Sequence, residues 1–174
     1  YAFSSLSVHA LHVMYLRPQL LAGLTQELKD EIDVARVALD LKEIDYEATV
    51  KTKLDIARRA YENDASVLER DGFIAYFKEN EHWLKPYAVF CVLRDLFGTA
   101  EHWRWGVFSE FSDDVLEKVS GKTSALRASV RFYYYLQYHL HAQLFAVSEY
   151  AKGSGIVLKG DLPVGVDKCS VDTW

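Results

Sequence analysis

The sequence predicts an α/β protein that is mostly helical, and two observations carry this prediction. The chain has 174 residues, half of them hydrophobic, with only three prolines and nine glycines. That is too few turn residues for an all-β protein. Near the C-terminal end, a long helical pattern, a glycine and the apolar run IVL at 156–158 follow one another. Because a run that is apolar at every position is typical of a strand buried on both faces, we expect a parallel strand there.

Two helices are predicted between residues 25 and 63. Thr25 is a suitable N-cap for the first, and acidic residues crowd its first turn. Apolar residues recur at helical spacing in both segments. They are Leu28, Ile32, Ala35 and Leu39 in the first, and Tyr46, Val50, Leu54, Ala57 and Tyr61 in the second. The short connection between the segments predicts an antiparallel helical hairpin.

Glycine and proline set the element boundaries that we expect further along. Asp71-Gly72 predicts a break before a short helix, and Pro86 fits the first turn of another helix, with Gly98 at its C-cap. Residues 98–123 have a turn-like, polar pattern. A long helix is then expected from Ser124 to Gly153.

Asp161 follows the predicted strand directly. In a (β/α)8 barrel the chemistry lies at the C-terminal ends of the strands, so Asp161 is a candidate active-site residue. Many other α/β proteins also have a strand that ends in an aspartate, so the spacing alone does not specify a barrel.

Composition argues against several classes of function. The net charge is −5 without a cluster of basic residues, which argues against nucleic-acid binding. No apolar run reaches the roughly 18 residues of a membrane span, so we expect no membrane association. Cys91 and Cys169 match no disulfide or zinc spacing, which favours reduced thiols in a cytoplasmic protein.

Histidines do not form a convincing metal site. His139 and His141 are two positions apart on a predicted helix and therefore point in nearly opposite directions. His9 and His12 could share a helical face, but no nearby cysteine or carboxylate completes a site. We therefore expect no metal.

Aromatic residues provide the remaining candidates for ligand contact. The run at 132–135 could stack against a sugar, although packing is the commoner role at helical spacing. Trp103 and Trp105, in the irregular segment, are better candidates for exposed aromatic side chains. The sequence contains no nucleophile elbow, phosphate-binding glycine loop or Cys-His arrangement.

Three stretches resemble one family of enzymes. They are SSLSVHALHVMYL (4–16), ENEHWLKPYAVFCVLRDLFG (79–98) and QYHLHAQLFAVSEYAKGSGIVLKGDLPVGVDKCSVDTW (137–174). They are similar to the 4-α-glucanotransferases of glycoside hydrolase family 77, the amylomaltases, and the last stretch is most similar to the plant-type cytosolic disproportionating enzymes. The most specific motifs are GDLP at 160–163 and SVDTW at 170–174.

The resemblance implies that the chain is an internal slice of an elaborated (β/α)8 TIM-barrel catalytic domain with a helical insertion. Residues 25–123 would form a helical subdomain, and residues 124–174 a barrel helix, a strand and the following loop. Asp161 would then support the active site by ordering an arginine, without being the nucleophile. The family's Arg-x-Asp-His nucleophile motif does not occur in these residues. We therefore expect this polypeptide alone to be inactive.

The resemblance also implies substrates and sugar-contacting residues. The donors would be α-1,4-glucans such as maltose, and the acceptors would be glycogen-like glucans or heteroglycans, with no cofactor. Phe3 stands where the family usually has a tyrosine next to the scissile bond, so one hydrogen bond of about 0.5–1.5 kcal/mol would be lost. Ser7 and Trp103 are the other candidate substrate-binding residues.

Two other functions remain open from the sequence. One is a non-catalytic helical interaction module, because the nucleophile motif is missing. The other is a barrel hydrolase that acts on α-glucans. An Arg-x-Asp-His motif downstream of Trp174 would favour the transferase, and a natural stop codon there would favour the module.

Overall fold

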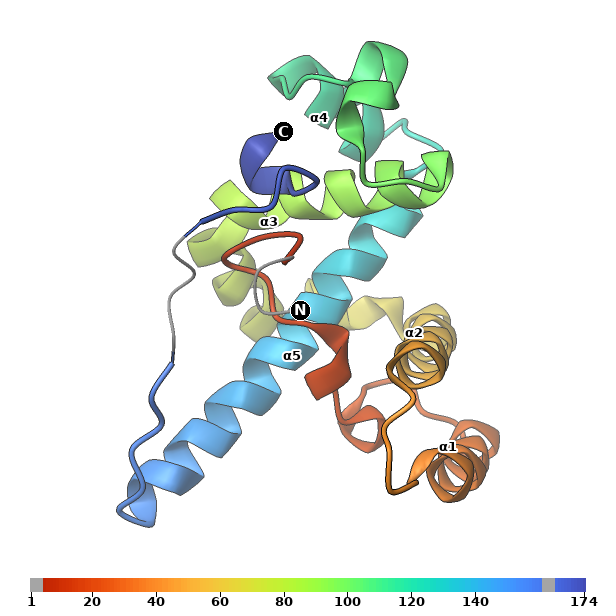
Figure 1. Ribbon diagram of the computed structural model, residues 1–174, viewed down its shortest axis with the longest axis vertical. Helices are drawn as coiled ribbons and strands as arrows, with labels where there is room; N and C mark the ends of the chain where they lie inside the picture. Colours follow the sequence, from red (N-terminus) through yellow and green to blue (C-terminus); the bar gives the residue numbers. More distant parts are fainter. Residues whose placement is uncertain (1–4, 161–164) are drawn as a thin grey trace. The chain divides into compact units, whose positions relative to one another are not determined.

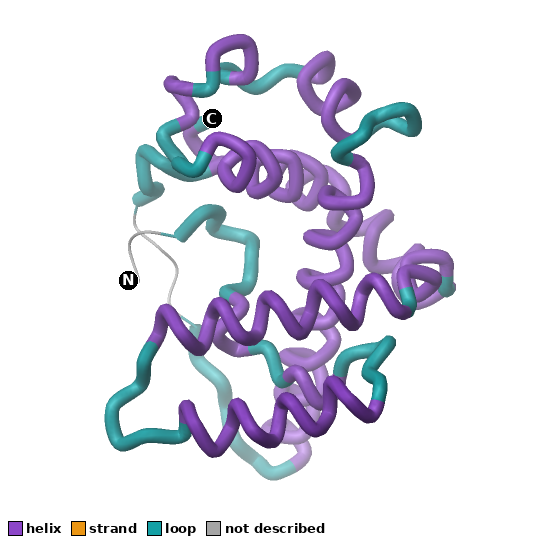
Figure 2. The backbone as a smooth tube through the Cα atoms, turned by 90° about the vertical axis from the view of Figure 1, so that its right-hand side faces the viewer, coloured by secondary structure: helices purple, strands orange, loops and turns teal. Residues whose placement is uncertain are grey.

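The computed structural model describes residues 5–160 and 165–174 (Figure 1). Its α-helices are α1 (Gln26–Leu39), α2 (Tyr46–Asn63), α3 (Asp71–Phe97), α4 (Asp113–Ser120) and α5 (Arg127–Gly153). Short 3-10 helices are η1 (Val13–Tyr15), η2 (Pro18–Leu20), η3 (Ala65–Glu69), η4 (His102–Arg104), η5 (Gly106–Phe108) and η6 (Val171–Thr173). The described residues contain helices and loops but no strand, as Figure 2 shows. The helix-rich part of the predicted fold class is therefore confirmed.

The chain forms two compact units. Within the described residues, unit 1 comprises 5–10, 74–134, 159–160 and 165–174, and unit 2 comprises 11–73 and 135–158. Unit 1 thus contains nearly all of α3, the whole of α4 and the two ends of the described chain. Unit 2 contains α1, α2 and most of α5.

Local capping and an apolar stripe form the helical hairpin of unit 2. The Thr25 hydroxyl accepts a hydrogen bond from the Leu28 amide at 3.2 Å, and the Asp45 carboxylate accepts one from the Ala48 amide at 2.9 Å. These side chains satisfy amides that a helix start leaves without partners. α1 and α2 pack against each other and run in opposite directions (Figure 2). The predicted N-cap and the antiparallel hairpin are both confirmed.

Two glutamines of α5 fix residues 11–17, the segment around η1 that precedes the hairpin. The Gln137 side chain accepts a hydrogen bond from the Leu11 amide at 3.0 Å and donates one to the Leu11 carbonyl at 2.9 Å. Gln143 forms the same pair with the backbone of Arg17, at 2.8 and 3.1 Å. Each glutamine amide offers one donor and one acceptor, so it satisfies both the N–H and the C=O of one residue, as a neighbouring strand would do in a sheet.

A new helix begins at Asp71-Gly72 after a break at Arg70, as predicted, but it is not short, and the placement of Pro86 at a helix start is wrong. α3 begins at Asp71 and continues through Pro86 to Phe97. Gly72 is explained by a close approach, since a Cβ there would lie 2.8 Å from the Tyr138 hydroxyl. Proline costs about 3 kcal/mol inside a helix. Residues 88–93, which are all buried, offset that cost by packing.

Residues 98–123 are more ordered than their composition predicts. Gly98 has a φ of 67° and ends α3, as expected for a C-cap glycine. Beyond it, α4 buries Val115 and Val119, and the Ser112 hydroxyl caps its first turn. The irregular assignment is therefore wrong for α4, whose apolar stripe has only two members and is difficult to recognise in the sequence.

The C-terminal part of α5 leads into the largest correction to the predicted fold. α5 starts at Arg127, three residues later than predicted, and ends at Gly153 as predicted. Residues 156–158 form no strand, and their side chains are 56%, 90% and 54% exposed. The prediction of a buried strand is wrong for this structure, because a strand must pair with another and the described residues provide none. No helix formed by the described residues is long and apolar enough to cross a membrane.

Candidate functional site

Residues from the two ends of the described chain meet in unit 1 around Ser7. The Ser7 side chain is buried, and its hydroxyl donates to one carboxylate oxygen of Asp172 at 3.2 Å and accepts from the His9 amide at 3.2 Å. The other carboxylate oxygen of Asp172 accepts from the Val8 amide at 2.8 Å. The Val171 amide donates to the Leu6 carbonyl at 2.9 Å. We call residues 5–10 and 165–174, held by these bonds, the terminal junction.

The C-terminal segment of the junction, residues 165–174, is shaped by short polar side chains. The Asp167 carboxylate accepts from the Cys169 amide at 2.7 Å, which closes a tight turn. The Thr173 hydroxyl lies 3.0 Å from the Lys168 carbonyl and 3.1 Å from the Ser170 carbonyl. Ser170 is fully buried. These bonds fix the backbone that presents Asp172 to Ser7.

Aromatic rings pack beneath the junction. The Trp174 indole donates to the Phe108 carbonyl at 2.9 Å, and its ring lies 5.8 Å from that of Trp105 and 5.7 Å from that of Phe90. Trp105 is 1% exposed and donates to the Thr99 carbonyl at 3.0 Å. The interpretation of Trp105 as an exposed aromatic residue is therefore wrong, because the indole N–H finds a backbone acceptor inside the core.

Trp103 differs from Trp105 in its exposure. It is 46% exposed, and the Lys168 ammonium lies 5.6 Å from its ring centroid. The His102 ring packs edge-on at 5.3 Å. The cation fixes the indole next to the terminal junction while leaving nearly half of its surface open. An open indole face of this kind can stack against the apolar face of a sugar ring.

A second aromatic pair in unit 1 involves the N-terminal part of the junction, residues 5–10. The His9 ring stacks on Trp83 at 5.8 Å with an interplanar angle of 25°, and it meets His82 edge-on at 6.2 Å. Trp83 donates to the Asn80 side chain at 2.9 Å. The stacking of His9 on Trp83 is not evident from the sequence, in which the two residues lie far apart. The roles of Asp172 and Lys168 are not evident there either, because each depends on a contact between residues far apart in the sequence.

The buried polar groups between α3 and the start of α5 are structural rather than reactive. Burial raises the pKa of the Cys91 thiol to about 12, so the thiol remains protonated and is a poor nucleophile. Arg94 binds the Asp95 carboxylate at 2.7 Å, and the Tyr133 hydroxyl donates to the same carboxylate. Cys169, which is half-buried, is also a free thiol. The run at 132–135 is buried, which confirms its packing role.

Carboxyl groups with shifted pKa values do not resemble a general acid. The pKa of Glu31 is lowered by the hydrogen bond from Arg59, that of Asp64 by the hydrogen bond from Ser66, and that of Glu81 by the hydrogen bond from Lys85. A glycosidase acid needs a raised pKa. The described residues contain no group of three or more histidines, cysteines or carboxylates that could hold a metal ion.

The predicted site residues fall into two groups. Ser7 and Trp103 lie in unit 1, one within the terminal junction and the other against its Lys168. Phe3 and Asp161 lie outside the described residues. His139 and His141 were predicted to point in nearly opposite directions from one helix. Both lie on α5, where His139 is buried and His141 is exposed, as this prediction requires.

Comparison with known proteins places the chain among enzymes of one kind. A family profile described as 4-alpha-glucanotransferase, of glycoside hydrolase family 77, matches residues 1–174. The chain is 48% identical over its full length to the 4-alpha-glucanotransferase DPE2 of Oryza sativa subsp. japonica, of which it covers 19%. It is 27% identical to the 4-alpha-glucanotransferase of Aquifex aeolicus and 24% identical to that of Chlamydia muridarum, over 99% of the chain in each case. It spans 33% and 32% of those two enzymes.

Proposed function

Because the chain belongs to the 4-alpha-glucanotransferase family, glycoside hydrolase family 77, we propose that the enzyme containing it transfers glucosyl or glucan units between α-1,4-glucans. Maltose is the proposed donor, and glycogen-like glucans or heteroglycans are the proposed acceptors. The observation that carries the proposal is the family match over residues 1–174, supported by the 48% identity to the rice enzyme. We propose the cytoplasm as its location, in keeping with two free cysteines.

The proposed reaction retains the anomeric configuration. Retaining enzymes use a carboxylate nucleophile and a second carboxyl group about 5 Å away, which acts first as acid and then as base. A sugar hydroxyl takes the place of water in the second step. The described residues contribute binding and positioning, since Glu31, Asp64 and Glu81 have lowered pKa values, which do not suit a general acid.

The proposed roles of individual residues follow from the family motif and the terminal junction. Asp161 would hold an active-site arginine, and Phe3 and Ser7 would line the donor site. Trp103 would offer its open face to the acceptor. Residues 25–123 would form a helical subdomain of the catalytic domain, and residues 124–174 would contribute to a (β/α)8 barrel.

An assay of the full-length enzyme with maltose and glycogen tests the proposed activity. We expect glucose release together with lengthening of the acceptor chains, and no release from the polypeptide of residues 1–174 alone. Glucose release without chain redistribution would identify a hydrolase. Absence of both reactions in the full-length protein would favour an interaction module.

The role of Asp161 has its own test. Asp161→Asn keeps the shape of the side chain but removes its charge, so turnover should fall by at least about 100-fold, equivalent to about 3 kcal/mol in the barrier. The melting temperature should change little. Near-normal turnover in the folded variant would remove Asp161 from the active site.

Trp103 is tested through the acceptor. Trp103→Ala should raise the KM for glycogen more than the KM for maltose, because the open indole face is proposed to contact the acceptor. Leu96→Ala, at a residue of unit 1 that is 59% exposed, is the control. Equal effects of the two variants on the glycogen KM would contradict the proposed contact.

A further inference from the structure

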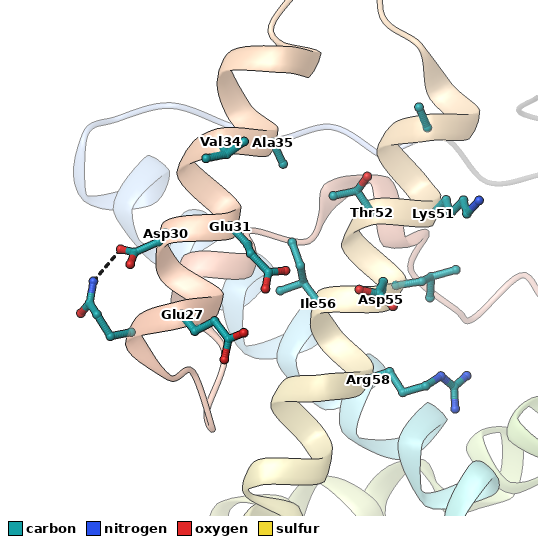
Figure 3. Close-up of a pocket in the computed structure, with 13 residues that line it drawn as sticks. Glu27, Asp30, Glu31, Val34, Ala35, Lys51, Thr52, Asp55, Ile56 and Arg58 are labelled. Atoms are coloured by element: carbon teal, nitrogen blue, oxygen red, sulfur yellow. Dashed lines mark hydrogen bonds between the residues drawn. The ribbon is translucent and has the colours of Figure 1, made fainter.

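The helical hairpin of unit 2 has a hollow on each of two sides, and their charges differ. The first, which we call the acidic hollow, has a volume of about 1240 Å³. Figure 3 shows Glu27 and Glu31 of α1 on the side toward α2, where Asp55 lies, while Asp30 of α1 points away from α2. The second, the basic hollow, has a volume of about 530 Å³ and is lined by α1, α2, η1 and η2. Ala35, Thr52 and Ile56 line both hollows and so form the wall between them.

In the acidic hollow, cations of the protein offset most of the negative charge. Lys51 and Arg58 line it together with the four carboxylates, and Arg59 pairs with three of those carboxylates. The Arg59 guanidinium binds both carboxylate oxygens of Glu31, at 2.5 and 2.8 Å. It also lies 3.9 Å from Glu27 and 3.8 Å from Asp55. This fork-to-carboxylate arrangement satisfies the charged groups within the protein. With Lys51 and Arg58 included, three cations face four carboxylates, so the acidic hollow keeps an excess of only about one charge near neutral pH.

In the basic hollow the positive charges lack such partners. Arg17, Arg36 and Lys53 line it, together with a single acid, Asp40. None of these three cations forms an ion pair with a carboxylate among the described residues. The hollow consequently carries an excess of about two positive charges near neutral pH.

Lys53 is the most deeply placed of the three cations. Its ammonium donates a hydrogen bond to the Met14 carbonyl, and burial lowers its pKa. A partly buried cation whose described partner is a neutral carbonyl is poorly compensated for the loss of water. An anion in the hollow would supply the missing compensation.

Other groups around the basic hollow fit a small polar ligand. The side chains of Thr49 and Thr52 line it and can donate hydrogen bonds to an oxyanion. Tyr15 and Ile44, also in the lining, are 80% and 57% exposed. The rim thus offers an aromatic ring and an apolar side chain on which a non-ionic portion of a ligand can rest.

We propose that the basic hollow is a binding site for a phosphate group, either free phosphate or the phosphate of a sugar ester. Two guanidinium forks and an ammonium are the groups that proteins use to bind phosphate. A phosphate carries about −1.5 to −2 charges at pH 7, which matches the excess positive charge of the hollow. The ligand would bridge α1, α2 and the segment that precedes them, since the three cations come from these three places.

Calorimetric titration of the full-length enzyme with inorganic phosphate, at constant ionic strength maintained with chloride, tests the proposal. We expect saturable binding that weakens at least about tenfold in Lys53→Met and in Arg36→Gln, because each loses a charge-assisted hydrogen bond. Arg36 is exposed, so its variant should fold even if Lys53→Met does not.

Lys51→Met is the matched control. Lys51 lies on the same helix and has the same charge, but it lines the acidic hollow. Its replacement should leave phosphate affinity unchanged. Absence of saturable binding, or equal weakening by the Lys51 and Arg36 variants, would overturn the proposal.

Parallel titrations with glucose 6-phosphate and glucose distinguish the two sources of phosphate. Tighter binding of the ester, with the difference abolished by Tyr15→Ala, identifies a phosphorylated sugar as the ligand. Equal affinities for the ester and inorganic phosphate identify free phosphate. Glucose that binds as tightly as its phosphate ester would contradict a phosphate site.

Discussion

The two units differ in how their stabilising contacts are distributed along the sequence. In unit 2, the hairpin is formed by neighbouring helices, each with its own N-cap, and by the Arg59–Glu31 ion pair between them. In unit 1, the terminal junction joins Ser7 and Val8 to Asp172 across more than 160 residues. Its aromatic core draws Phe90, Trp105 and Trp174 from three separate segments.

The difference shows which type of interaction dominates each unit. Exposed ion pairs such as Arg59–Glu31 contribute little, because water already solvates both partners. Buried aromatic rings contribute much more, through the apolar area that they remove from water. We therefore expect the largest single effects in unit 1, although unit 2 has the more regular architecture.

Replacement of Trp105 should have the largest effect on stability. Trp105→Ala removes a side chain that is 1% exposed, along with its ring contacts to Phe90 and Trp174. The free energy of unfolding should fall by about 3–5 kcal/mol, as for other buried aromatic residues replaced by alanine. Denaturant unfolding followed by far-UV circular dichroism measures this loss. Trp103→Ala, at the exposed tryptophan, should cost less than about 1 kcal/mol, and equal losses would contradict the assigned core.

Acidification should destabilise unit 2 through His139. Burial lowers the pKa of His139 to about 4, and the nearby Arg70 charge acts in the same direction while Asp64 opposes both. Its Nε2 atom has no hydrogen-bond partner among the described residues. Between pH 6.5, the usual pKa, and about pH 4, the unfolded chain binds the proton that the folded chain excludes. The folded state should therefore lose up to about 3 kcal/mol over this range.

His139→Gln tests this assignment, because glutamine does not titrate. The stability of the variant should depend less on pH between 6.5 and 4 than that of the unmodified protein, as measured by denaturant unfolding at each pH. An unchanged dependence would show that His139 is not the group responsible.

Sequence patterns predicted the local features of both units. The Thr25 N-cap, the hairpin and the glycine ends of α3 and α5 depend on residues a few positions apart, so they are legible in the sequence. The errors arose where distant contacts override local preference. Pro86 lies in mid-helix because the packing of the buried residues 88–93 offsets its cost. Trp105 is buried because the rings of Phe90 and Trp174, from distant segments, pack against it.

The candidate site shows the same limit. Ser7 and Trp103 were selected through resemblance to a family and through local composition, and neither approach indicated their partners. Asp172 and Lys168 lie in the C-terminal segment, and only the folded chain brings them to Ser7 and Trp103. The run at 156–158 fails for a related reason: strand formation needs a neighbour, which a pattern of three residues cannot specify.

Two glycines with positive φ provide a smaller, matched comparison between the units. Gly23 in unit 2 has a φ of 82°, and a Cβ there would overlap the carbonyl oxygen of Ala60. Gly98 in unit 1 has a φ of 67°, with no atom near the position of a Cβ. Gly98→Ala should lower the free energy of unfolding by about 1–2 kcal/mol, because alanine disfavours the left-handed backbone conformation. Gly23→Ala should lower it by more than about 2 kcal/mol, because the overlap with Ala60 adds to the same effect. Equal losses in chemical denaturation would show that the approach of Gly23 to α2 is not close.

The smallest effect on stability is expected at the terminal junction. There Asp172 accepts hydrogen bonds from residues far away in the sequence, whereas Asp167 accepts one from a residue two positions away. Asp172→Asn leaves one oxygen for the amide of Val8 or the hydroxyl of Ser7, so one of two hydrogen bonds is lost. The cost should be about 1 kcal/mol, because Val8 and Asp172 are exposed and water can replace the missing partner. Asp167→Asn keeps the oxygen that accepts from the Cys169 amide within a tight turn, so its cost should be close to zero. Thermal unfolding of both variants gives the difference. Equal melting temperatures would mean that the bonds between Ser7, Val8 and Asp172 do not hold the junction, and that the Val171–Leu6 backbone bond and the aromatic core do so without them.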